Sequence, residues 1–200
     1  MQYKPTRIKV ESFLEKADWR FDKKAEQLHL VLISILAFLT PALMGYCQVV
    51  GVVGTGILLT FAAIGMRGRN IIPVILLPPL GLFFFARLFG IETGFSIEVI
   101  PILWIVNFVY VSSFKYLNYR INAGYWEAGI GASLLQALIL LCVVNILVYL
   151  GISTMETTVE AFPEEGCYFT FVPSAILELL STLIALIIVG LGKELVIKRK

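Results

Sequence analysis

The sequence predicts an all-α fold: a polytopic integral membrane bundle of six transmembrane helices with an N-terminal amphipathic interfacial helix. Composition is the first observation behind this prediction. Of the 200 residues, 58% are hydrophobic and 15% are charged, and the mean hydropathy is +0.88. Soluble domains have roughly 45–50% apolar and about 25% charged residues. The apolar excess is too large for a soluble core, and it indicates extensive contact with lipid.

The second observation is the length of the apolar runs. Six runs form a predicted transmembrane domain over residues 28–192, and a basic cytoplasmic tail covers residues 193–200. The runs cover residues 28–47, 49–66, 71–89, 95–114, 128–150 and 168–192. A bilayer core of roughly 30 Å needs about 20 helical residues, so we expect each run to cross it once.

The N-terminal segment, residues 1–27, is charged and lacks the features of a cleaved signal peptide. Its apolar residues recur at helical spacings of three, four and seven, which places them on one face. These residues are Val10, Phe13, Leu14, Ala17 and Phe21. We expect an amphipathic helix on the membrane surface. The alternative is a helix that packs on cytoplasmic loops or on a partner.

The first two runs are almost continuous and should form a tight helical hairpin. Gly51, Gly54 and Gly56 in its second half permit close approach of the two backbones. The third run contains the pair Pro78 and Pro79. This pair should bend or break the helix, with neighbouring groups satisfying the carbonyls that the prolines leave free.

The fifth run begins with small residues at intervals of four, which favour close helix packing. These helix-packing residues are Ala128, Gly129, Ala132, Ser133 and Ala137. We expect this face to contact another helix of the same bundle, and the alternative is contact with another subunit.

The basic residues predict the orientation. With six spans, fifteen of the sixteen Lys and Arg residues fall on one face, and only Arg87 falls on the other. The positive-inside rule assigns the basic face to the cytoplasm. Both termini are therefore predicted to be cytoplasmic, in the plasma membrane of a prokaryote. The longest outer loop, residues 151–167, has four glutamates and no cation. It either attracts cations or is simply solvated.

Glu178 is an ionisable residue well inside the sixth run. A carboxylate at that depth costs roughly 2.5 kcal/mol or more unless it is paired, protonated or hydrated. Four more polar residues map to the outer half of the bundle at 1.5 Å per helical residue: Arg87, Glu98, Asn145 and Gln48. These five residues are the candidates for a ligand-binding site or a buried ion pair.

Two explanations of these residues remain open. In the first, Arg87 pairs with Glu98 or Glu178 and locks helices together, because buried charges need partners. In the second, the same groups line an outward-facing pocket for a small polar or cationic solute. Small and polar residues around Glu178 predict that it faces the bundle interior. They are Ser174, Ala175, Ser181, Thr182 and Ala185.

Other classes of function have little support in the sequence. No HExxH, GxSxG or P-loop motif occurs, and His29 is the single histidine, so we expect no enzyme, no metal site and no cofactor. The basic residues follow the cytoplasmic edge, so we expect no nucleic-acid partner. Cys47 and Cys167 fall near the outer surface and are either two free thiols or a disulfide.

The size, the six spans, the two cytoplasmic termini and the polar residues in the outer half resemble a known family. They are similar to the substrate-binding S components of energy-coupling factor (ECF) transporters. The resemblance implies a six-helix subunit that binds a vitamin or metal from outside and docks on a coupling subunit with two ATPases. That family commonly has an alanine-xxx-alanine docking face on its first helix. Here the first run has Ala37-xxx-Pro41, and small residues four apart occur on the fifth run instead.

The function that we expect from the sequence is an integral membrane solute-binding subunit of a transporter. The alternative is a non-catalytic accessory or assembly subunit of a larger membrane complex. In both cases the expected partners are the lipid bilayer and other membrane subunits.

Overall fold

The computed structural model describes residues 11–18, 23–45, 48–89, 100–149, 176 and 179–190. Every regular element in these residues is helical, which confirms the all-α class. The α-helices are α1 (Glu11–Leu14), α2 (Lys23–Leu39), α3 (Gln48–Gly65), α4 (Ile72–Phe89), α5 (Ile100–Tyr119) and α6 (Tyr125–Tyr149). Two short 3-10 helices, η1 (Thr40–Gly45) and η2 (Gly68–Ile71), precede α3 and α4. A last apolar helix covers Leu179–Gly190.

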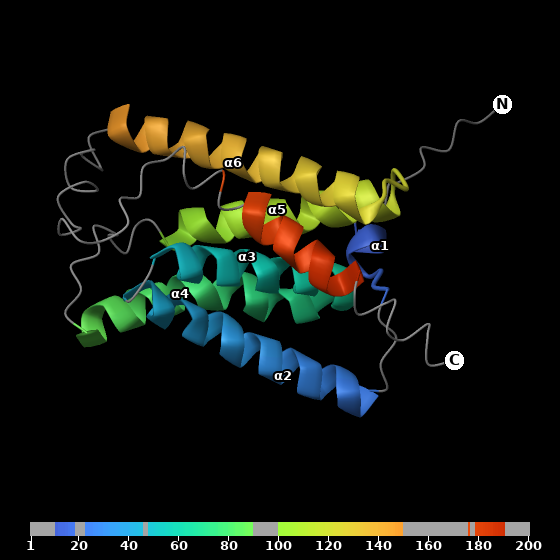
Figure 1. Ribbon diagram of the computed structural model, residues 1–200, viewed down its shortest axis with the longest axis horizontal. Helices are drawn as coiled ribbons and strands as arrows, with labels where there is room; N and C mark the ends of the chain where they lie inside the picture. The colour runs from blue at the N-terminus through green and yellow to red at the C-terminus, as the bar shows by residue number, and fades with distance from the viewer. Residues whose placement is uncertain are drawn as a thin grey trace, which may run out of the picture.

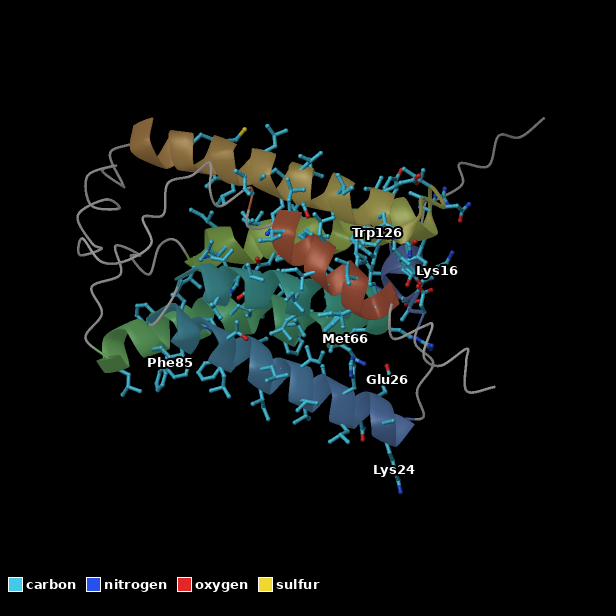
Figure 2. All side chains as sticks on the ribbon, in the orientation of Figure 1. Lys16, Lys24, Glu26, Met66, Phe85 and Trp126 are labelled. Carbon is cyan, nitrogen blue, oxygen red and sulfur yellow. The ribbon has the colours of Figure 1, made fainter. Side chains whose placement is uncertain are left out.

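The long helices lie side by side along the long axis of the molecule (Figure 1). Helices α3, α4 and α5 contact one another, α6 packs on α5, and α2 packs on α4. Charged side chains of the described residues gather at one end of this bundle. Figure 2 shows Lys16, Lys24 and Glu26 at that end and Phe85 at the opposite end. We call the first of these the charged end.

Three helical stretches are long and apolar enough to cross a membrane: Lys24–Ala42, Gly68–Phe85 and Ile100–Tyr119. Val50–Gly65 and Leu179–Gly190 are shorter apolar helices. Many large apolar side chains on these helices are exposed, including Leu28 at 70% and Ile105 at 58%. Exposed apolar helices of this length are typical of a membrane protein.

Two predicted helix boundaries are wrong by about a turn or more. The first helix begins at Lys23, ahead of the apolar run that starts at Leu28, and becomes 3-10 helix at Thr40. Pro41 follows directly and has no N–H to continue the α-helical pattern. The fourth predicted run, residues 95–114, corresponds to α5, which continues to Tyr119.

At Gly54 the close approach is to a side chain, not between two backbones as the sequence predicts. A Cβ atom added at Gly54 would lie only 2.7 Å from Cγ2 of Thr40. Because glycine has no Cβ, the Thr40 side chain of η1 can pack directly against the backbone of α3 at this point. The Thr40 hydroxyl donates to the carbonyl of Leu36 in the preceding helix α2 at 2.6 Å.

The proline pair does not break α4, which is continuous from Ile72 to Phe89. Pro79 has no N–H, so it leaves the carbonyl of Ile75 without its helical partner. The side-chain amide of Asn107 on α5 donates to this carbonyl at 3.2 Å. Trp104, one turn earlier on α5, donates to the Leu76 carbonyl at 3.0 Å. The prediction that neighbours satisfy the freed backbone groups is therefore confirmed at Ile75.

The helix Leu179–Gly190 has the two faces that its sequence predicts. Ser181, Thr182 and Ala185 are fully buried, whereas Leu180 and Ile187 are exposed. The buried face packs on the small residues of α6: a Cβ atom at Gly129 would lie 2.8 Å from Cγ2 of Thr182. Ala128, Ala132 and Ser133 are buried in the same region, and Ala137 is half-buried.

The N-terminal segment differs from the long surface helix that its periodicity predicts. Its described part, residues 11–18, is helical only in α1. The backbone N–H of Asp18 instead donates to the carbonyl of Ile64 in α3 at 3.0 Å. Bonds to other helices replace continued helix here, so the described part of the segment packs on helices of the bundle. We call residues 13–18 the N-terminal clamp.

Candidate functional site

Lys115 is the most unusual polar residue of the described chain. The sequence places it in a cytoplasmic loop after the fourth apolar run, but the structure places it inside α5 with no exposed surface. Helical spacing explains its burial, because Lys115 shares one face of α5 with the buried residues Asn107 and Val111. A buried ammonium group needs several hydrogen-bond acceptors to offset its loss of water.

Backbone carbonyls supply these acceptors. The Lys115 ammonium donates to the carbonyl of Met66, just beyond the end of α3, at 2.8 Å. It also donates to the carbonyl of Lys16 in the N-terminal clamp. The Tyr119 ring lies 5.3 Å from the ammonium nitrogen, within the range of a cation–π interaction. Lys115 therefore joins three segments that are far apart in the sequence.

The same contacts complete the carboxyl end of α3. The last carbonyls of a helix have no partners within it, and they carry a partial negative charge. Here Ile64 receives the N–H of Asp18 and, at 3.4 Å, the hydroxyl of Tyr119. Met66 receives the ammonium of Lys115. A positive charge at this position is favourable because of the helix dipole.

A second set of bonds ties the clamp to α6. The Tyr125 hydroxyl, at the first residue of α6, donates to the carboxylate of Asp18. Burial, followed by this carboxylate, raises the pKa of Tyr125. The ring of Phe13 packs edge-on against Tyr116 with 5.8 Å between ring centroids. The N-terminal clamp thus covers the charged end by contacts with α3, α5 and α6.

A cluster of hydroxyl groups lies deeper in the bundle. The Tyr110 hydroxyl is 2.6 Å from the Thr60 hydroxyl and 3.0 Å from the Thr182 hydroxyl. Ser133 is 2.8 Å from the same Thr182 oxygen. All four side chains are at most 1% exposed. This hydroxyl cluster, Thr60, Tyr110, Ser133 and Thr182, joins α3, α5, α6 and the helix Leu179–Gly190.

Two more buried polar side chains adjoin the hydroxyl cluster. Gln136 lies one turn beyond Ser133 on α6, and Ser181 is next to Thr182; both are at most 1% exposed. The apolar residues around them, including Leu59, Phe114 and Ala132, are also buried. The interior of the bundle therefore contains a polar strip that crosses four helices.

The structure does not test whether the five site residues predicted from the sequence meet, because none of their side chains is described. Glu98 and Glu178 are not among the described residues. Arg87 lies in the last turn of α4, Gln48 begins α3 and Asn145 lies near the end of α6, and only their backbones are described. Cys47 and Cys167 are likewise outside the described residues, and Cys142 is an exposed free thiol on α6.

Sequence reasoning missed Lys115, Thr60 and Tyr110. A signal existed for Tyr110, because it lies three residues after Asn107 and four before Phe114 on the face that is buried. The apolar pattern alone does not distinguish the hydroxyl groups of Thr60 and Tyr110 from the apolar side chains around them. Lys115 gave no such signal, since a lysine after an apolar run usually marks the membrane boundary.

Comparison with known proteins adds no relative: no protein-family model, curated protein sequence or solved structure matches the chain.

Proposed function

We propose that the chain is an integral membrane solute-binding subunit of a transporter, with six spans and both termini in the cytoplasm. The hydroxyl cluster is the observation that carries this proposal. Its polar side chains come from four different segments and meet inside a bundle of largely apolar helices. Polar groups within a membrane interior commonly mark a solute pathway, and pockets between bundle helices are common ligand sites.

The proposed solute site extends from the hydroxyl cluster away from the charged end. Glu178 precedes Thr182 by four residues, the spacing that places two residues on one face of a helix. In the proposal, Glu178 and the outer residues Arg87, Glu98, Asn145 and Gln48 contact a small polar or cationic solute that enters from outside. This arrangement is similar to the S components that the sequence resembles.

The charged end supports the proposed orientation. Lys16 and Lys24 lie at this end (Figure 2), as the positive-inside rule requires of the cytoplasmic face. Single cysteines introduced at Glu160 and Arg69 test it in intact cells with an impermeant thiol reagent. We expect labelling at position 160 alone. Labelling at position 69 would contradict the orientation.

A second candidate is an accessory or assembly subunit of a membrane complex. It is favoured by the fact that the hydroxyls of the cluster bond to one another. Such interhelical hydrogen bonds hold membrane helices together without any ligand. In that role the cluster is purely structural, and recognition takes place on the outer surface of the bundle.

One purification distinguishes the two candidates. The wild type, Glu178→Gln and a control, Tyr116→Phe, are purified from membranes with their partners, and their bound small molecules are identified by mass spectrometry. Tyr116 is a half-exposed tyrosine outside the hydroxyl cluster, so its substitution tests for unspecific effects. A solute-binding subunit should yield one enriched polar compound that Glu178→Gln loses while its melting temperature is retained. A constant set of membrane subunits with no enriched compound would favour the accessory role.

A further inference from the structure

A groove of about 550 Å³ lies between α1, α5 and α6 near the charged end. Its walls include Phe13, Tyr116, Leu117 and Leu135, and Ser112 and Gly131 also line it. A Cβ atom at Gly131 would lie 2.8 Å from the end of the Leu117 side chain, so the glycine lets Leu117 pack closely against α6 in the groove wall. Pockets of roughly 300–1,000 Å³ are large enough for small organic ligands.

The groove opens toward the outside of the bundle. Tyr116 and Leu135 in its walls are 47% and 40% exposed, and Leu134 and Leu138 beside it are also exposed. The stretch Ile100–Tyr119, which forms one wall, is apolar enough to cross a membrane. What covers the groove is therefore lipid, provided that the chain has the membrane placement of the proposed function.

The polar groups around the groove define its ligand more closely. The Ser112 hydroxyl is buried and has no hydrogen-bond partner within the described part of the chain. Toward the charged end, the exposed side chains of Lys16 and Arg120 follow the wall residues Phe13 and Tyr116 by three and four positions. Glu127 lies on the α6 side, where its carboxylate accepts the N–H of Gly124 at 3.1 Å.

We infer that this groove binds an acyl chain of an anionic phospholipid from the cytoplasmic leaflet. The chain lies against the apolar walls of the groove. The phosphate lies near Lys16 and Arg120. Arg120 is two helical turns from Ser112, about 12 Å at 1.5 Å per residue, and its long side chain can reach back toward the groove. Juxtamembrane Lys and Arg residues are the groups that attract anionic headgroups.

The test uses two lipid probes with identical acyl chains, phosphatidylglycerol and phosphatidylcholine. The full chain is equilibrated with each in detergent micelles, and the retained lipid is counted by native mass spectrometry. We expect the wild type to retain more phosphatidylglycerol. Gly131→Leu fills the groove and should lower retention of both lipids by about fivefold or more, which corresponds to roughly 1 kcal/mol. The double variant Lys16→Gln, Arg120→Gln should remove the preference for phosphatidylglycerol and keep the binding of phosphatidylcholine.

Gly190→Leu is the matched control, because a Cβ atom at Gly190 meets nothing within 4 Å. It should retain lipid as the wild type does. If Gly131→Leu does not fold, which loss of its cooperative melting transition would show, Leu135→Trp is used in its place. This substitution fills the groove from its exposed side. Equal retention by the wild type and the filled variant, or no retention by the wild type, would overturn the inference.

This inference rests on the membrane placement in the proposed function, and the readouts separate the two. Lipid retention is measured without any solute. A chain that retains lipid here and yields no polar compound contradicts only solute binding. A chain that yields the compound and retains no lipid contradicts only the groove. Recovery of the chain in the aqueous phase without detergent would contradict both.

Discussion

The side-chain ammonium of Lys115 and the backbone carbonyl of Met66 are joined by a 2.8 Å hydrogen bond, at the point where α3 ends. This bond joins α5 to the end of α3. The second bond of the same ammonium joins α5 to the N-terminal clamp. Lys115 is thus a fixed cation that caps one helix and anchors another segment.

Replacing Lys115 by methionine, which has a similar length, should detach the N-terminal clamp. The carbonyls of Lys16 and Met66 would lose their donor, at a cost of about 1–3 kcal/mol for each buried carbonyl left unsatisfied. We expect a lower melting temperature and faster tryptic cleavage after Lys16, followed by mass spectrometry. Arg69→Met is the control, because the Arg69 side chain is exposed. Equal cleavage rates in wild type and Lys115→Met would show that the clamp does not depend on this lysine.

Replacing Asn107 by leucine should strand the Ile75 carbonyl that Pro79 leaves free. We expect a loss of about 1–3 kcal/mol in the free energy of unfolding, measured by thermal denaturation in detergent. Adding Pro79→Ala restores a backbone N–H that can bond to Ile75 within α4. The double variant should therefore recover part of the loss. Additive effects of the two substitutions would mean that Asn107 does not compensate for the proline.

Replacing Gly81 by alanine should force α2 and α4 apart. A Cβ atom at Gly81 would lie 2.2 Å from the carbonyl oxygen of Phe38, and a backbone atom cannot move aside cheaply. We expect a destabilisation of about 1–3 kcal/mol, as for other overpacked sites. Gly190→Ala is the same change in open space and should be close to neutral. Similar melting temperatures for the two variants would contradict the close approach of α2 and α4.

Tyr125 should make stability depend on alkaline pH. Its pKa in the folded protein is raised above the ordinary value of 10.0 by burial and by the Asp18 carboxylate. A group with a raised pKa contributes stability that is fully present below its unfolded pKa and is lost as the pH rises toward the folded one. The free energy of unfolding should therefore fall above about pH 10. Tyr125→Phe lacks this titration, so its pH profile should be flatter there than that of the wild type.

The sequence predicted the features that local pattern controls. The buried stripe of Ser181, Thr182 and Ala185 follows from helical spacing, and the need for a donor near Pro79 follows from proline chemistry. The burial of Lys115 could not be predicted in this way. Its two carbonyl partners are 49 and 99 residues away, and only the assembled bundle brings them together. The same reason explains why α1 ends after four residues.

The candidate site was predictable only in part. The positions of Glu178 and Arg87 within their predicted apolar runs identified them as ionisable groups in an apolar setting. That prediction stays untested. The hydroxyl cluster was not predicted as a unit, because Thr60, Tyr110 and Thr182 come from three segments that are 50 and 72 residues apart. Hydroxyl side chains are tolerated in apolar runs, so nothing in the local sequence indicates that they meet.

The N-terminal clamp also sets an order of events during synthesis. Residues 13–18 leave the ribosome before their partners Ile64, Lys115 and Tyr125. The clamp cannot settle until the first turn of α6 has been translated, so this early segment is among the last to reach its final place. Until then residues 13–18 lack the partners that hold them in the finished bundle. A folded domain fused to the amino terminus would therefore have to leave the clamp free to close over helices that are inserted after it.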